Sequence, residues 1–216
     1  MSAATVRAIV AAVALVAAMA PRADAQRLSA GAGYAFAEYA EQGASLRFAG
    51  DGIAGHAAIG WRRFDLLASA ARLAFEPEAA GESFDLVQMD VRVRARLTRV
   101  ASAEVGFLQR DVTPLHAAQS VGTLRIGALA AFPLAPGSDV TVRGAWLAGS
   151  AFSGGGAAPF AMEVGLNASY APWSERVRIT GDLEFQRFDR RTSTAGGRLD
   201  APIQSTMARI GVTVVR

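Results

Sequence analysis

Apolar and polar residues alternate along most of the chain from residue 28 onward. In the run 87–97 the odd positions hold Val, Met, Val, Val, Ala and Leu, while the even positions hold Gln, Asp and three Arg. Because successive side chains of a β-strand point to opposite faces, this period of two predicts a strand with one apolar and one polar face. The same alternation recurs at 159–172, 176–188 and 208–214, and it indicates an all-β protein.

Ten strands are predicted from these runs, at 28–40, 52–64, 66–76, 84–97, 103–113, 119–132, 139–150, 159–172, 176–188 and 202–216. The third is the weakest, because its leucines and alanines would also suit a short helix, and eight strands is the alternative count. Long connections (41–51, 77–83, 114–118, 151–158, 189–201) alternate with short ones (65, 98–102, 133–138, 173–175). This asymmetry is typical of transmembrane β-barrels, and an even strand number returns both chain ends to the same side.

The first 25 residues have the three parts of a secretory signal peptide. Arg7 precedes an unbroken apolar run at 8–20, which is followed by the small-x-small cleavage site Ala23-Asp24-Ala25. The apolar run is shorter than the ~20 residues that a helix needs to cross a bilayer. We therefore expect a secreted chain that is cleaved after Ala25, with residues 1–25 as signal peptide and 26–216 as one domain.

Composition excludes several classes of protein. Of the 216 residues 51% are hydrophobic and only 19% are charged, which is too apolar for a disordered chain. There is no Cys, so neither a disulfide scaffold nor a Cys-rich zinc module is expected. All 22 basic residues are Arg, but 19 acidic residues reduce the net charge to +3, so no nucleic-acid partner is expected.

Aromatic residues concentrate near the ends of the predicted strands, whereas the core of a soluble barrel would place them in the middle. Such rings at both rims of an apolar band form the girdles of a barrel that crosses a membrane. The predicted strands, at 11–15 residues, also exceed the ~9–11 that a tilted strand needs to cross the hydrocarbon. The predicted girdle comprises Phe36, Tyr39, Trp61, Phe64, Phe75, Phe84, Phe132, Phe160, Tyr170, Trp173, Phe185 and Phe188.

Residues 26–216 thus resemble the small outer-membrane β-barrel proteins of Gram-negative bacteria, in overall pattern and without a family-specific motif. The resemblance implies a single closed antiparallel up-and-down transmembrane barrel in the bacterial outer membrane, with both termini periplasmic. It implies outer-membrane lipid as the surroundings, the barrel-assembly machinery as a partner during biogenesis, and a monomer. A soluble periplasmic barrel that binds an apolar ligand inside is an alternative.

If the apolar face meets lipid, the charged residues line the lumen. The opposite orientation would put arginines in the bilayer at ~2–4 kcal/mol each. The first two strands offer mostly Gly, Ala and Ser on this face, which leaves room for large Arg side chains from other strands. Nine Arg face five acids, so either ion pairs plug the lumen or the surplus makes a narrow, porin-like, anion-favouring pore. The predicted lining comprises Arg72, Asp90, Arg92, Arg94, Arg96, Glu104, Arg110, Arg125, Arg143, Glu163, Arg178, Asp182, Glu184 and Arg209.

Residues for catalysis or metal binding are scarce. The two histidines, His56 and His116, are far apart in sequence, so we expect no metal site and no cofactor. A lipid hydrolase at the outer rim would need a His, a Ser and an acid, and His116, Ser120 and Asp111 form the only local trio. A protease with Asp opposite His could draw on Asp189 as well. Neither spacing is diagnostic, and we expect a non-enzymatic barrel with a structural or surface-interaction role, no catalytic residues and a solvated His116.

Overall fold

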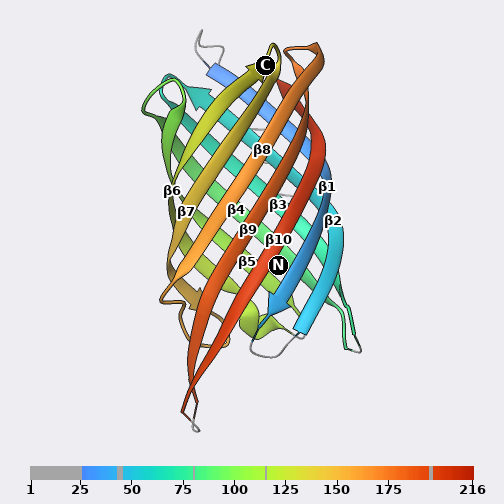
Figure 1. Cartoon of the computed structure of the whole chain (residues 1–216), viewed down its shortest axis with the longest axis vertical. Coiled ribbons are helices and arrows are strands. Elements are labelled where there is room, and N and C mark those ends of the chain that lie inside the picture. Colours follow the sequence, from blue (N-terminus) through green and yellow to red (C-terminus); the bar gives the residue numbers. More distant parts are fainter. Residues whose placement is uncertain (1–25, 43–45, 80, 115, 195–196) are drawn as a thin grey trace.

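The structure, a computed structural model, describes residues 26–42, 46–79, 81–114, 116–194 and 197–216. The predicted signal peptide lies outside these residues. Ten antiparallel strands form a closed up-and-down barrel, in which each strand pairs with its neighbours in sequence and β1 pairs with β10 (Figure 1). The strands are β1 (Gln26–Glu41), β2 (Leu46–Trp61), β3 (Phe64–Pro77), β4 (Phe84–Arg96), β5 (Ala101–Thr113), β6 (Val121–Ala135), β7 (Ser138–Phe152), β8 (Ala161–Ser174), β9 (Val177–Thr194) and β10 (Gly197–Val215).

The predicted fold class and the count of ten strands are confirmed. The weakest predicted element is strand β3, which pairs along its length with both β2 and β4. The only helical element in the described part of the chain is a single 3-10 turn, η1 (Ala117–Gln119). Among the described residues no helix is long and apolar enough to cross a membrane.

The barrel has two different ends. At the turn end, uppermost in Figure 1, short connections at 62–63, 97–100, 136–137 and 175–176 join the strands. Leu28 and Arg216 exchange backbone hydrogen bonds there, which closes the barrel between β1 and the chain's last residue. At the opposite loop end the connections after β3, β5 and β7, at 78–83, 114–120 and 153–160, are longer, and the β9–β10 hairpin extends farthest (Figure 1).

Two segments differ from prediction at the loop end. Strand β2 begins at Leu46 instead of 52, and residues 189–201, predicted as a loop, mostly continue β9 and β10. Gly50, from the predicted loop, and Gly52, from the predicted strand, both lie inside β2, where neighbouring residues come close. A Cβ on Gly52 would collide with the carbonyl oxygen of Arg72, and one on Gly50 would lie 2.6 Å from the ring of Phe75. These glycines therefore reflect crowding within the sheet and not a break in it.

The apolar face changes sides along several strands, of which β4 is the clearest. On β4 the inward row begins with Phe84 and Leu86 and becomes polar from Gln88 onward. The outward row begins with Asp85 and is apolar from Val87 onward. Near the loop end the barrel is therefore apolar inside, and over the rest of its length it is apolar outside and charged inside.

This inversion corrects the predicted girdle. Four of its twelve members are buried inside the barrel: Tyr39, Phe75, Phe84 and Phe188. They were assigned to a lipid interface because they lie near strand ends, but the strands continue past the apolar band, and there the inward face is the apolar one. Seven members are exposed on the outside, and Phe185 faces outward half-buried. The exposed seven are Phe36, Trp61, Phe64, Phe132, Phe160, Tyr170 and Trp173.

Candidate functional site: the interior of the barrel

The interior consists of three layers along the barrel axis. The loop-end cluster is apolar, the central network is made of buried ion pairs, and the turn-end vestibule is a polar cavity. Inward-facing residues of successive strands build all three layers. The layer to which such a residue belongs depends on its distance along the strand from the loop end.

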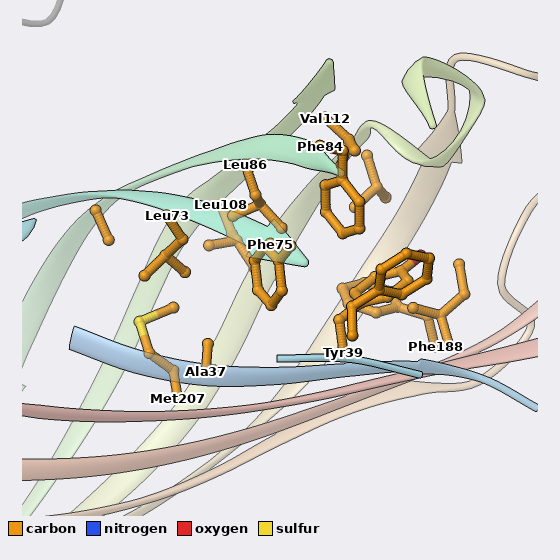
Figure 2. Packing of buried hydrophobic residues seen from close by; sticks show 14 of the residues in the cluster. Ala37, Tyr39, Leu73, Phe75, Phe84, Leu86, Leu108, Val112, Phe188 and Met207 are labelled. Carbon is orange, nitrogen blue, oxygen red and sulfur yellow. The ribbon is translucent and has the colours of Figure 1, made fainter. Parts of the chain in front are cut away.

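Aromatic rings pack edge to face in the loop-end cluster (Figure 2). The ring of Tyr39 lies 5.5 Å from that of Phe84 and 6.2 Å from that of Phe75, and these two phenylalanines stack at 4.8 Å. Aliphatic side chains from β3, β4, β5 and β10 fill the spaces between them. The layer packs like the core of a soluble protein and leaves the loop end filled by side chains.

A short network covers this cluster from the loop end. Arg190 donates to the side-chain oxygen of Gln119 at 2.7 Å, and Gln119 donates to Glu41 at 2.8 Å. The guanidinium of Arg190 also lies over the ring of Phe152, 4.8 Å from its centre. These contacts hold η1 against the ends of β1, β7 and β9.

Arg125 is the centre of the network in the middle layer. It is 0% exposed, and it donates to Asp90 at 2.7 Å and to Glu163. Glu104 lies 3.6 Å from the same guanidinium. Burying charges costs several kcal/mol per ion unless partners compensate, and here three carboxylates from three strands surround one guanidinium.

Two further arginines, Arg143 and Arg209, complete the network. Arg143 donates to Glu163 at 3.0 Å, to Asp182 at 2.8 Å and to Glu184 at 2.7 Å. Arg209 donates to Glu184 at 2.7 Å and also to Asp182. Shared carboxylates make these pairs one connected unit, so displacing one side chain removes partners from several others.

Two glutamines and Arg110 join the network to the loop-end cluster. Gln88 and Gln186 donate to Glu184 at 2.9 and 2.8 Å. Arg110 has no ion pair among the described residues, and it donates instead to Gln186 and, at 2.9 Å, to Ser205. Its guanidinium lies 5.6 Å from the centre of the Phe188 ring, where charged and apolar layers meet.

The vestibule is a cavity of about 850 Å³ on the turn-end side of the network. The small residues of β1 and β2, among them Gly33, Ala54 and Ala58, form part of its wall and leave the space open. Eight arginines and four acids line it. These are Arg27, Arg92, Arg94, Arg96, Arg99, Arg143, Arg178, Arg209, Asp65, Asp139, Glu175 and Asp182.

The structure places thirteen of the fourteen predicted lining residues inside the barrel, and Arg72 is the exception. The side chain of Arg72 is 52% exposed between the buried Ala71 and Leu73, and it pairs across the outer surface with Asp85 at 2.9 Å. The prediction placed Arg72 in the lumen because an arginine that faces lipid is costly. Arg72 lies near the loop end, where the inward face of the strand is apolar and the outward face is polar. An outward charge at this position therefore lies beyond the apolar band.

Sequence reasoning missed several inward residues. Asp65 and Arg190 were assigned to connections, but both lie within strands, and Asp65 pairs with Arg96 at 2.6 Å. Asp139 was the first residue of a predicted strand. Its even spacing from Thr141 and Arg143 was a signal that it shares their inward face.

The candidate catalytic trio is not assembled. Ser120 accepts a hydrogen bond from the backbone of Val112 at 2.9 Å, and Asp111 accepts one from Gln109 at 2.7 Å. His116 was predicted to be solvated, but its ring packs against Phe48 and Phe84, 5.3 and 5.1 Å between centres. Among the described residues no group of three or more His, Cys, Asp or Glu is placed to hold a metal ion.

Comparison with known proteins shows the fold. No family model matches the chain, and no curated protein matches it in sequence. The solved structure of the outer membrane protease OmpT from Escherichia coli has 8% sequence identity and a TM-score of 0.54, and the match covers 89% of this chain and 97% of that one. Neisserial surface protein A has 12% sequence identity and a TM-score of 0.40, and the match covers 87% of this chain and 96% of that one. The attachment invasion locus protein Ail of Yersinia pestis has 13% sequence identity and a TM-score of 0.37, and the match covers 88% of this chain and 99% of that one. The likeness to OmpT shows that this chain has the fold of an outer-membrane β-barrel.

Proposed function

We propose that this chain is an integral outer-membrane protein whose barrel is closed by its own side chains, so that it serves as a structural or surface-interaction barrel and neither conducts ions nor catalyses a reaction. The observation that carries the proposal is the central network, in which the side chains of Arg125, Glu104 and Glu163 are all 0% exposed.

The outer surface supports a membrane location. Large apolar side chains are exposed on the outward rows of all ten strands, for example Ile53, Val91 and Val164. A soluble monomer rarely exposes an apolar patch above a few hundred Å², so an apolar belt around the whole barrel argues for lipid contact. The same belt argues against the soluble ligand-binding barrel, whose apolar surface would have to face inward.

Closure of the lumen supports the plugged barrel over the pore. An anion that crossed would have to separate Arg125 from Asp90 and Glu163, and then displace the packed rings of Tyr39, Phe75 and Phe84. A ten-stranded barrel is narrow enough for side chains to fill it, whereas aqueous channels are found at 16 strands or more. The surplus of arginines is therefore not evidence of a conducting path.

The loop end supports the surface-interaction role. The β9–β10 hairpin extends beyond the other strands (Figure 1), and the outward rows of the strands are polar in this region, as at Asp51, Asp85 and Asp111. Binding sites commonly lie on loops that a rigid scaffold presents. The candidate nucleophile Ser120 is 8% exposed, and its hydroxyl oxygen accepts a hydrogen bond from the backbone of Val112, which supports a barrel that catalyses no reaction.

Conductance of the purified protein in planar lipid bilayers tests the proposal. Folding is checked first by gel migration, since a folded barrel and the heat-denatured chain migrate differently. We expect no current steps above background at protein amounts at which a general porin, measured in parallel, inserts repeatedly. Reproducible steps from the folded protein, above all anion-selective ones, would refute the closed barrel.

A further inference from the structure

We propose that the turn-end vestibule binds a phosphate-type oxyanion through Arg94 and Arg99, with Arg27 adding to the positive field. This site goes beyond the closed-barrel function, because a barrel sealed in its middle can still hold a ligand in a cavity that opens at one end.

The vestibule is blind and of ligand size. Its floor is formed by Arg92, Arg143 and Arg209 of the central network, and its mouth by residues of the turn end such as Arg99 and Glu175. The volume of about 850 Å³ lies within the ~300–1,000 Å³ usual for small-molecule sites.

The carboxylates of the vestibule are already engaged. Asp65 accepts from Arg96 at 2.6 Å, Asp182 accepts from Arg143 at 2.8 Å, and Asp139 accepts from Ser169 at 2.7 Å and from Arg178. Glu175 lies 3.5 Å from Arg178. Eight arginines and four acids line the wall. Three of the arginines, Arg92, Arg143 and Arg209, also pair with carboxylates of the central network, so the surplus positive charge rests on the arginines that lack a close acid.

The surplus is located on particular side chains. Among the described residues neither Arg27 nor Arg99 forms an ion pair, and Arg94 has only Glu104 at 3.8 Å, beyond hydrogen-bond distance. The Nε atom of Arg94 is buried and has no hydrogen-bond partner there, while the side chain as a whole is 24% exposed. Arg125, by contrast, has a carboxylate oxygen at 2.7 Å. The arginines of the floor have close carboxylates, whereas Arg27, Arg94 and Arg99 have none within hydrogen-bond distance among the described residues.

The spacing of these groups suits an anion with more than one oxygen. Arg92, Arg94 and Arg96 stand on one face of β4, about 7 Å from one to the next, and Arg99 follows in the adjoining turn. A guanidinium presents a planar fork of N–H donors that matches phosphate oxygens, and it keeps its charge at any physiological pH. The hydroxyl of Thr213 and the ring of His56, 3.1 Å apart on the same cavity wall, add further hydrogen-bonding groups.

Phosphate oxygens could reach this mouth from two sources, a soluble phosphorylated compound or the headgroup of an anionic lipid. Leu134 and Trp173, the latter 78% exposed, lie at the turn-end tips of β6 and β8 and bring the mouth close to the lipid surface. The chemistry of recognition is shared by both sources, so both are tested.

The first experiment measures binding of inorganic pyrophosphate by calorimetry, with the folded protein in phosphatidylcholine nanodiscs at low salt. We expect saturable binding that Arg94→Gln/Arg99→Gln weakens at least tenfold. The matched control is Arg176→Gln/Arg62→Gln, which removes the same charge from exposed turn-end residues outside the cavity lining and should change affinity less than threefold. Arg27→Gln/Arg99→Gln, which leaves the neighbourhood of Glu104 intact, tests the mouth alone and should also weaken binding.

The second experiment measures the ³¹P resonances of nanodiscs that contain phosphatidylglycerol. Broadening of a headgroup signal by the wild-type protein, lost in Arg94→Gln/Arg99→Gln but kept in the control, would identify a lipid source. A variant-dependent loss in either experiment supports the site and names the source. If the lining and control variants behave alike in both, the proposal is wrong, whatever the bilayer conductance of the barrel proves to be.

Discussion

Single residues of the barrel differ in how much they contribute to the free energy of unfolding, and we expect the contribution of Arg125 to be large. Replacing it with Met removes one of the two guanidinium partners from both Asp90 and Glu163, in a layer that water does not reach. Breaking a buried ion pair on one side typically costs ~3–5 kcal/mol. We expect Arg125→Met to lower the free energy of unfolding by about that amount, as measured by urea titration of the barrel in detergent micelles.

The matched control is Arg72→Met, the same exchange on the outer surface. Arg72 and Asp85 are both roughly half exposed, and exposed pairs contribute ~0–1 kcal/mol. A loss of stability for Arg72→Met as large as for Arg125→Met would mean that burial does not govern the strength of these pairs.

The same two residues show how far sequence reasoning extends at this scale. Alternation places Arg125 correctly, because Leu124 and Ile126 on either side make the outward row unambiguous. Around Arg72 the neighbours Ala71 and Leu73 are apolar as well, so only the expectation that arginines avoid lipid assigned it to the lumen. That expectation holds within the apolar band and fails where the strand leaves it.

At the scale of the strand, the inversion of faces predicts that one substitution has two different costs along β3. Ala68 and Ala74 both face outward, but Ala68 pairs with Ala57 and Val91, whereas Ala74 pairs with Asp51 and Asp85. An arginine in the lipid midplane costs ~2–4 kcal/mol and one near the interface ~0–1. We expect Ala68→Arg to destabilise the barrel by the larger amount and Ala74→Arg to be near neutral, in urea titrations of the protein folded into lipid vesicles.

Equal effects of the two arginines in vesicles would contradict the inversion. The measurement also locates the edge of the apolar band on β3, which strand boundaries alone do not give. Phe75 and Phe84 were predicted to lie at that edge because strand boundaries alone were taken to mark it. Their inward position follows from the opposite character of the rows that flank them, with Asp85 next to Phe84 and Glu76 next to Phe75.

Strand ends were harder to predict than strands, and β2 shows the reason. Its loop-end half contains Gly50 and Gly52, which in most sequences mark a turn. Here they are needed because the sheet is crowded where β2 meets β3, a contact between residues that lie about twenty positions apart in sequence. A pairing of this kind is set by the closed barrel as a whole, so no local pattern could reveal it.

At the scale of the whole molecule, one closed sheet has the polarity of a soluble domain at its loop end and that of a membrane protein over the rest of its length. Near the loop end it has an apolar interior and a polar exterior, as a soluble domain has. Over the membrane band the polarity is reversed, and the charges that lipid excludes are neutralised against one another in the central network. The vestibule exists because the small residues of β1 and β2 leave one side of the lumen unfilled at the turn end.

This arrangement bears on orientation, since the part that resembles a soluble domain should project into water on the side of the longer connections. The chain has no Cys, so single cysteines can report on each end separately. Ser153→Cys lies in the exposed connection between β7 and β8, and Arg176→Cys lies in the exposed turn between β8 and β9. We expect a membrane-impermeant maleimide to label Ser153→Cys on intact cells, and to label Arg176→Cys only after the outer membrane has been permeabilised.

The reverse labelling pattern would place the vestibule at the cell surface and the loop-end cluster in the periplasm. Any oxyanion would then reach Arg94 and Arg99 from outside the cell. With the expected orientation, the arginine-lined mouth faces the periplasm, and only ligands of that compartment or headgroups of the inner leaflet can enter it. The two cysteine variants therefore decide which phosphate compounds are worth testing against the vestibule.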